Sequence, residues 1–134
     1  MEYRYNEAVS VQALAALRES VGWNRMEKEY GDPRMTSFCH IAAYEGDTLA
    51  GFVDCVSNGV TDACIQDLMV SPAFQGQGIG TALMRRMIAY LKEQRIYMIS
   101  VLFEEELRPY YERFGFRTIL SGQMETYQEQ KTTP

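Results

Sequence analysis

The sequence predicts an α/β fold of the α+β type, in a single domain that spans residues 1–134. Two observations predict this class. Several short apolar or alternating runs are separated by turn residues, which indicates antiparallel hairpins. Further along, residues 65–103 hold an apolar run, a glycine-rich turn, an amphipathic helix and a second apolar run, which places two strands parallel. We therefore expect a mixed central sheet of about six or seven strands, with about three or four flanking helices.

In the N-terminal half, Ser10 can cap a first helix whose apolar residues recur at helical spacing. Residues 45–47, Glu-Gly-Asp, are typical of a hairpin turn. Residues 23–33 are left open between a second short helix and an ordered loop. The expected elements are an edge strand at residues 3–5, a helix from Val11 to Gly22, and strands at 38–44 and 48–57.

In the C-terminal half, Pro109 is tolerated only in the first turn of a helix, and Gly115 can end that helix. Ser121-Gly122 indicates a turn between two last strands. The expected elements are the strand 61–70, the helix 81–94, the strand 97–103, a short helix at 109–114 and a closing hairpin of residues 116–120 and 123–127. The polar tail from residue 128 is expected to be frayed.

The composition, with 46% hydrophobic and 23% charged residues, is that of a globular chain. The net charge of −5 argues against nucleic-acid and anionic-membrane partners, because both are bound largely through lysine and arginine. No apolar run is long enough to span a membrane, and the N-terminus lacks the apolar core of a signal peptide. We therefore expect a soluble, cytoplasmic protein.

The cysteines, Cys39, Cys55 and Cys64, are odd in number and include no Cys-x-x-Cys pair, so we expect free thiols. The single histidine, His40, lies in an apolar strand-like run and is interpreted as structural. With only one histidine, the chain has few of the residues that a metal cluster or a histidine-based triad needs, so no metal site is expected.

The glycine-rich turn at residues 75–80, Gln-Gly-Gln-Gly-Ile-Gly, predicts a main-chain anion site. Its alternate glycines lack a Cβ, and the helix behind them presents free N–H groups and the positive end of its dipole. Phosphate is the usual occupant of such a site. A dinucleotide fingerprint is excluded because Thr81 stands where its third glycine belongs, and a nucleotide-triphosphate loop because no lysine follows Gly80.

With its flanks, the turn resembles the acyl-CoA signature of the GNAT superfamily of N-acetyltransferases: Gln75-x-x-Gly78-x-Gly80 follows a strand that ends in Leu-Met-Val-Ser-Pro. Residues 109–116, Pro-Tyr-Tyr-Glu-Arg-Phe-Gly-Phe, also match that family's pattern of an aromatic residue, a tyrosine, three residues and Gly-Phe. The two motifs cover the C-terminal half, and the N-terminal half agrees in the order of its elements.

The resemblance implies acetyl-CoA as co-substrate, with its pyrophosphate on the amides of residues 77–81. Main-chain N–H of Met69 or Val70 would meet the thioester carbonyl if the strands beginning at Ile65 and Tyr97 diverge. Tyr111 would donate a proton to the departing thiolate, whereas Tyr110 is interpreted as a packing residue. The implied coenzyme-contacting residues are Leu68, Met69, Val70, Gln75, Gly76, Gln77, Gly78, Ile79, Gly80, Thr81 and Tyr111.

A general base is also needed, because an ammonium has no lone pair. Asp67 and Glu104 are the candidates. Each has a second interpretation: Asp67 as a surface carboxylate paired with a helix, and residues 104–106 as a solvated acidic turn. Many family members have asparagine where this chain has Glu104, so this carboxylate either repels coenzyme phosphates or serves as the base. Trp23 and Tyr30 are either core anchors or walls of the acceptor pocket.

The predicted function is direct transfer of an acetyl group from acetyl-CoA to a primary amine, with no covalent enzyme intermediate, because no cysteine has a histidine partner. A non-catalytic CoA-binding sensor on the same fold is the alternative, and an interaction protein without coenzyme is the third hypothesis. The acceptor is a small-molecule or peptide amine, such as a polyamine or a lysine side chain. A homodimer is a possibility by family likeness alone.

Overall fold

The structure is a computed structural model that describes residues 1–127. The tail predicted to be frayed lies outside the described residues. The chain divides into two compact units, Met1–Val101 and Leu102–Pro134. The first holds the sheet and most of the helices, and the second begins directly after the last strand.

The first unit is built on one mixed sheet of five strands in the order β1-β2-β3-β4-β5. Neighbouring strands are antiparallel except β4 and β5, which are parallel. The parallel strand pair predicted from the glycine-rich turn and its helix is therefore confirmed. The strands are β1 (Glu2–Tyr5), β2 (Cys39–Glu45), β3 (Thr48–Ser57), β4 (Asp62–Val70) and β5 (Met98–Val101).

The helices of the first unit begin where the sequence indicates. The side chain of Ser10 accepts a hydrogen bond of 3.2 Å from the amide of Ala13 and caps the first helix. The segment left open, residues 23–33, contains a four-residue helix. The helices are α1 (Val11–Ser20), α2 (Glu27–Tyr30), the 3-10 turn η1 (Pro72–Phe74) and α3 (Ile79–Glu93).

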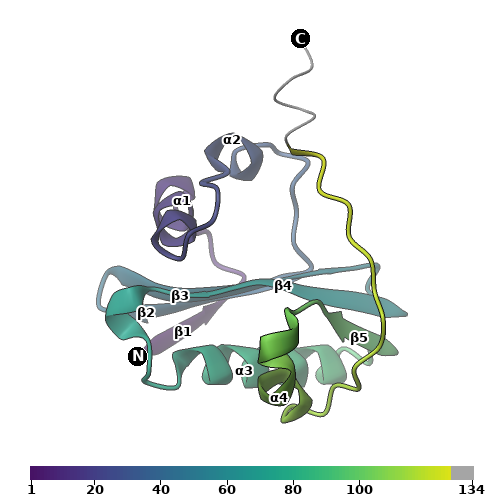
Figure 1. The fold of residues 1–134 in the computed structure, drawn as a ribbon. Coiled ribbons are helices and arrows are strands. Elements are labelled where there is room, and N and C mark those ends of the chain that lie inside the picture. Colours follow the sequence, from purple (N-terminus) through teal and green to yellow (C-terminus); the bar gives the residue numbers. More distant parts are fainter. Residues whose placement is uncertain (128–134) are drawn as a thin grey trace. The chain divides into compact units, whose positions relative to one another are not determined.

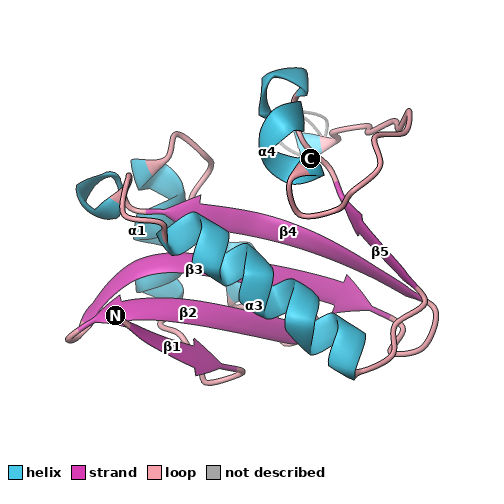
Figure 2. Ribbon diagram, turned by 90° about the horizontal axis from the view of Figure 1, so that it is seen from below, coloured by secondary structure: helices cyan, strands magenta, loops and turns pink. Residues whose placement is uncertain are grey.

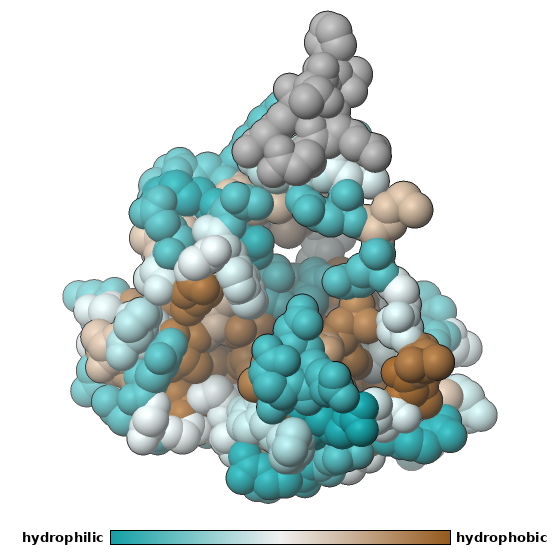
Figure 3. Space-filling view, in the orientation of Figure 1, coloured by the Kyte–Doolittle hydropathy of each residue, from teal (hydrophilic) through white to brown (hydrophobic). Residues whose placement is uncertain are grey.

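The helices cover the two faces of the sheet: α1 and α2 lie on one face and α3 on the other (Figures 1 and 2). On the α1 face, Leu14 and Leu17 pack against Phe52 and Met69. Figure 3 shows apolar side chains gathered below α1, where the helix meets the sheet, and hydrophilic residues over α1 and α2. On the α3 side, the fully buried residues include Leu83, Met84, Met87 and Leu91.

Gly51 in β3 sets how closely α3 approaches the sheet. A Cβ at this position would lie 3.1 Å from Cδ1 of Leu83 and 3.2 Å from Cγ2 of Ile79. Such a short separation leaves no room for a larger side chain. The start of α3 is therefore held tightly against β3, and this position fixes where the glycine-rich turn begins its helix.

The second unit contains a 3-10 turn, η2 (Glu105–Leu107), and the short helix α4 (Arg108–Glu112). Pro109 lies in the first turn of α4, as predicted. The predicted closing hairpin is wrong: residues 116–126 form no strand, so the described sheet has five strands instead of six or seven. The side chains of Ile119, Leu120 and Met124 are exposed, and a hairpin with no packed apolar face is only marginally stable in water.

Candidate active site

The glycine-rich turn joins β4 to α3 through η1. The side chain of Gln75 donates a hydrogen bond of 3.0 Å from Nε2 to the carbonyl of Val70, which ties the turn to the end of β4. Gly76 and Gly78 each have a backbone φ of +81°, a conformation that residues other than glycine rarely adopt. No atom lies within 4 Å of the position of a Cβ at either residue, so the space above them is open.

The amides of this turn are available to a ligand. Gly78 is the residue before α3 and provides no side-chain cap. The first hydrogen bond into α3 runs from the amide of Ala82 to the carbonyl of Gly78, at 3.0 Å. Within residues 1–127, the amides of residues 76–80 donate no hydrogen bond to another backbone carbonyl. Free N–H groups at the positive end of a 15-residue helix form a site for an anion.

The strands β4 and β5 run together over only part of β4. Their pairing begins at Asp62 opposite Met98 and ends at Ile65 opposite Val101. Beyond Ile65, β4 pairs with β3 alone among the described residues. From this point β4 and β5 diverge (Figure 2). The residues predicted to meet the thioester, Met69 and Val70, lie in this diverging part. Open parallel strands generally place their ligands at such a point.

A β-bulge interrupts β4 in the same region. Phe52 is opposite Met69 and Asp54 is opposite Gln66, so Val53 faces two residues of β4. One of them, Asp67, has φ of +55°, a left-handed conformation that costs roughly 1 kcal/mol for a residue other than glycine.

The carboxylate of Asp67 is held from both sides. Nη1 of Arg18 lies 3.4 Å from its Oδ1, and the hydroxyl of Tyr30 donates to its Oδ2 at 3.3 Å. Burial, followed by the nearby charge of Asp67, raises the pKa of Tyr30, so its hydroxyl stays protonated and can donate. The ion pair with Arg18 of α1 agrees with the second interpretation of Asp67, a carboxylate paired with a helix. Whether it also acts as a base stays a prediction.

The two aromatic residues near this ion pair differ. Trp23 is 41% exposed and stands under the guanidinium of Arg18, with 5.3 Å between its ring centre and Cζ. It is therefore no core anchor. Tyr30 is half-buried and packs against the apolar cluster of α1 and β3, which combines a core contact with its hydrogen bond to Asp67.

In the second unit, Tyr111 is only 7% exposed and lies in an aromatic cluster. Its ring stacks on Phe103 with 4.7 Å between the ring centres, and the edge of Tyr110 meets it at 5.1 Å. Burial raises the pKa of Tyr111, with a further contribution from Tyr110, so the phenol stays protonated at neutral pH. A protonated phenol can donate a proton, which is the role predicted for Tyr111.

Glu104 is exposed and precedes η2. Its carbonyl accepts a hydrogen bond of 2.9 Å from the amide of Leu107, and the next residue, Glu105, forms an ion pair with Arg108 at 3.6 Å. This arrangement is that of a solvated acidic turn, the second interpretation of residues 104–106. Asp67 and the glycine-rich turn belong to the first unit, whereas Tyr111 and Glu104 belong to the second.

The single histidine is held by neighbouring groups, and the cysteines are unpaired. Nε2 of His40 lies 2.6 Å from the carbonyl of Glu7, and Nδ1 lies 3.1 Å from the hydroxyl of Ser37, so both ring nitrogens are engaged. All three cysteines are free thiols. Among residues 1–127, no group of three or more potential ligands could hold a metal ion, and no helix is both long and apolar enough to cross a membrane.

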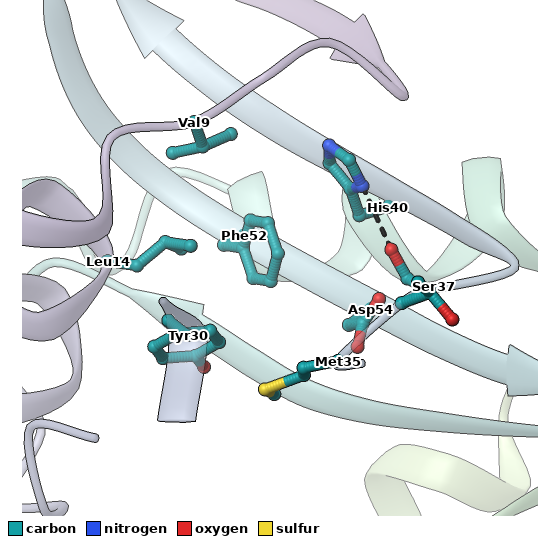
Figure 4. A pocket seen from close by; sticks show the side chains of 9 residues that line it. Val9, Leu14, Tyr30, Met35, Ser37, His40, Phe52 and Asp54 are labelled. Carbon is teal, nitrogen blue, oxygen red and sulfur yellow. Dashed lines mark hydrogen bonds between the residues drawn. The ribbon is translucent and has the colours of Figure 1, made fainter. Parts of the chain in front are cut away.

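Sequence reasoning missed a cavity on the α1 face of the first unit. Its volume is about 130 Å³. Figure 4 shows the side chains around it, with the carboxylate of Asp54 at one end. A signal was present in the sequence, because Asp54 interrupts the apolar run Phe52-Val53-Asp54-Cys55-Val56. The cavity is lined by Val9, Leu14, Tyr30, Met35, Thr36, Ser37, His40, Phe52 and Asp54.

Comparison with known proteins identifies the family of this chain. The sequence model of the acetyltransferase (GNAT) family matches residues 8–116, and the chain belongs to this family of acetyl-CoA-dependent N-acetyltransferases. A GNAT-family acetyltransferase from Streptococcus pneumoniae TIGR4 has a similar structure, with a TM-score of 0.76 and 27% identity over 92% of this chain and 96% of that one.

In two curated relatives, the match to this chain covers only part of the relative's own length. An uncharacterised N-acetyltransferase, ycf52, of Gracilaria tenuistipitata var. liui is 29% identical over 88% of this chain and 68% of its own length. The histone acetyltransferase TAP1 of Glycine max is 29% identical over 85% of this chain and 54% of its own length. The chain thus spans between about half and two thirds of these relatives.

Proposed function

We propose that this chain binds acetyl-CoA through the backbone of its glycine-rich turn and transfers the acetyl group directly to a primary amine. The observation that carries the proposal concerns the amides of residues 76–80. Among the described residues, they donate no hydrogen bond to a backbone carbonyl. The left-handed glycines and the open space above them allow a diphosphate to approach these amides closely. The residues present therefore fit the co-substrate that the family uses.

Bound acetyl-CoA supplies a thioester whose carbonyl carbon accepts the amine. We propose that main-chain N–H of Met69 or Val70, in the diverging part of β4, stabilises the negative charge that develops on the carbonyl oxygen. The protein also removes a proton from the ammonium before attack, since only the neutral amine has a lone pair. When the carbon–sulfur bond breaks, Tyr111 donates its phenolic proton to the thiolate, and the proton that the attacking nitrogen loses as it becomes an amide restores the phenol.

Of the two candidate bases, the contacts favour Glu104. The carboxylate of Asp67 already interacts with Arg18 and Tyr30, so both of its oxygens are engaged within the protein. Glu104 is exposed and carries no such contact among the described residues. We propose that Asp67 holds the bulge of β4 in place and that Glu104 takes up the proton, directly or through a water molecule.

The test is a titration of the protein with acetyl-CoA, followed by thiol release with a panel of amines. Calorimetry should give a dissociation constant in the micromolar range that is typical of substrates. Thiol release should require both acetyl-CoA and an amine. If acetyl-CoA does not bind, the proposal is wrong at its first step.

Replacing Tyr111 with phenylalanine separates catalysis from binding. Tyr111→Phe keeps the ring and its stacking on Phe103 but removes the acidic proton, so we predict a fall in turnover of at least about 100-fold. The dissociation constant of acetyl-CoA should change less than about twofold. Tyr110→Phe is the matched control, because it removes a phenol from the neighbouring residue, and it should leave turnover nearly unchanged. Equal losses in both variants would contradict the assignment of Tyr111.

A CoA-binding sensor is the second candidate, and the exposed carboxylate of Glu104 favours it, because the family often has asparagine there. Binding of acetyl-CoA without thiol release across a broad amine panel would support the sensor. The acceptor is proposed to be a small-molecule or peptide amine. A homodimer and a cytoplasmic location stay predictions, which sedimentation and cell fractionation can test.

A further inference from the structure

Asp54 is a buried carboxylate with an unused oxygen. It lies in the middle of β3 and is 7% exposed. Its Oδ2 accepts a hydrogen bond of 3.2 Å from Nε2 of Gln66. Its Oδ1 has no partner of good hydrogen-bond geometry among the described residues, although the backbone of Cys55 and the hydroxyl of Ser37 lie near enough to the carboxyl group to lower its pKa. Most buried polar atoms have a partner, because an unsatisfied one is costly. A buried carboxylate oxygen without one therefore points to a missing ligand.

This oxygen belongs to a side chain that lines the cavity on the α1 face (Figure 4). The walls differ from end to end. Val9, Leu14 and Phe52 supply apolar surface at one end, and Asp54, Ser37 and His40 lie together at the other. The cavity therefore suits an amphipathic ligand with an apolar stem and a polar head.

The cavity provides no lysine or arginine as a partner for Asp54. A carbonyl can only accept a hydrogen bond, so Nε2 of His40 donates to the carbonyl of Glu7, and Nδ1 lies 3.1 Å from the hydroxyl of Ser37. The nine lining residues include no lysine or arginine. The nearby Arg18 pairs with Asp67 instead.

Size limits the ligand further. The volume of about 130 Å³ is roughly four times the 30 Å³ that a water molecule occupies in the liquid, and cavities near this size hold ligands of about six heavy atoms. A primary ammonium with about three to five carbons matches this volume.

We propose that this cavity binds a primary ammonium on a short aliphatic stem, with the ammonium against Oδ1 of Asp54 and the stem along Phe52 toward Leu14. This inference rests on the proposed function in one respect: it takes the bound ammonium to belong to the acceptor substrate. Asp54 is then the residue that selects a charged amine. Its Oδ1, which has no partner in the free protein, accepts a hydrogen bond from an N–H of the substrate.

The single histidine gives a direct readout of binding. Because His40 is the only histidine and lines the cavity, its ring resonances are unambiguous in an NMR titration. n-Butylammonium chloride should shift these resonances in a saturable way, and n-butanol, of the same length without the charge, should shift them at least about tenfold less at equal concentration. Equal shifts by the two compounds would overturn the proposal, and this comparison needs only the wild-type protein.

The variant Asp54→Asn keeps the shape of the side chain and removes its charge. We expect its affinity for n-butylammonium to fall at least tenfold, whereas Asp47→Asn, the same change at an exposed turn, should bind as the wild type does. Wild-type affinity in Asp54→Asn would overturn the proposal. Acetyl-CoA calorimetry on the same variant should be unchanged, so failure of the ammonium site is distinguishable from failure of acetyl-CoA binding.

Discussion

Two regions of the first unit hold polar groups that have no partner among residues 1–127, and the two regions differ in the kind of group. At the glycine-rich turn the unpartnered groups are backbone amides, which attract negative charge. In the cavity on the α1 face the unpartnered atom is Oδ1 of the Asp54 carboxylate, and a carboxylate attracts positive charge. Under the two proposals made above, this one unit holds a site for an anionic coenzyme that is built from main chain and a site for a cationic acceptor that is built from a side chain.

The largest expected effect comes from placing a negative charge at the turn. Gly78→Asp should weaken acetyl-CoA binding at least about 100-fold, because the carboxylate would face the diphosphate at close range. Gly22→Asp is the matched control: Gly22 has φ of +86° and equally open surroundings, so it carries the same strain and the same charge elsewhere. Calorimetry of both variants checks the prediction, and similar losses in the two would show that charge at the turn is not the cause.

A smaller effect is expected where Arg18 holds the bulge of β4. Arg18→Met leaves the carboxylate of Asp67 without its cation in a mostly buried setting, and we predict a loss of about 2 kcal/mol in the free energy of unfolding. Urea denaturation measures it. In a double-mutant cycle with Asp67→Asn, the two losses should be strongly non-additive. Additive losses would mean that the pair does not stabilise the bulge.

Loss of charge in the cavity should raise the free energy of unfolding, whereas Arg18→Met should lower it. Asp54→Asn should stabilise the protein by about 1 kcal/mol at neutral pH, because the ionised carboxylate has an unsatisfied buried oxygen. A residue kept for binding at the expense of stability is expected at a functional site. Urea denaturation at pH 7 checks this, and a clear loss of stability would indicate that Asp54 serves the fold instead.

The pH dependence of that gain follows from the same carboxyl group. Burial raises the pKa of Asp54 above its ordinary value of 3.8, against the effect of the hydrogen bond from Gln66. The folded chain therefore keeps this proton to a higher pH than the unfolded chain, and ionisation destabilises the fold. The advantage of Asp54→Asn should be near zero below pH 3.8, grow as pH rises through the folded pKa, and then stay constant. An advantage that is independent of pH would exclude ionisation of Asp54 as its cause.

The two regions also differ in how far the sequence predicted them. The turn was predicted because its determinants are local: left-handed glycines, a proline before them and an amphipathic helix behind them. The cap at Ser10 and the helix start at Pro109 are local in the same way. For such elements, spacing along the chain is enough to indicate structure.

The cavity and the ion pair depend on contacts between distant parts of the chain. Arg18 and Asp67 are 49 residues apart, and the cavity collects residues from two loops, two helices and two strands. Nothing in the spacing of these residues reveals that they meet. The wrong closing hairpin has a related cause, because the alternation around Ile119 fits a strand, but a strand needs a packed face that the sequence alone does not provide.

The most direct test of the account is an amide NMR titration of the ¹⁵N-labelled protein with acetyl-CoA. If backbone amides hold the diphosphate, the resonances of residues 76–80 should shift together and saturate, and CoA without the acetyl group should shift them in the same way. The amide of Gly22, in the same backbone conformation but at the end of α1, should not move. Unchanged resonances at residues 76–80 in protein saturated with acetyl-CoA would contradict the account.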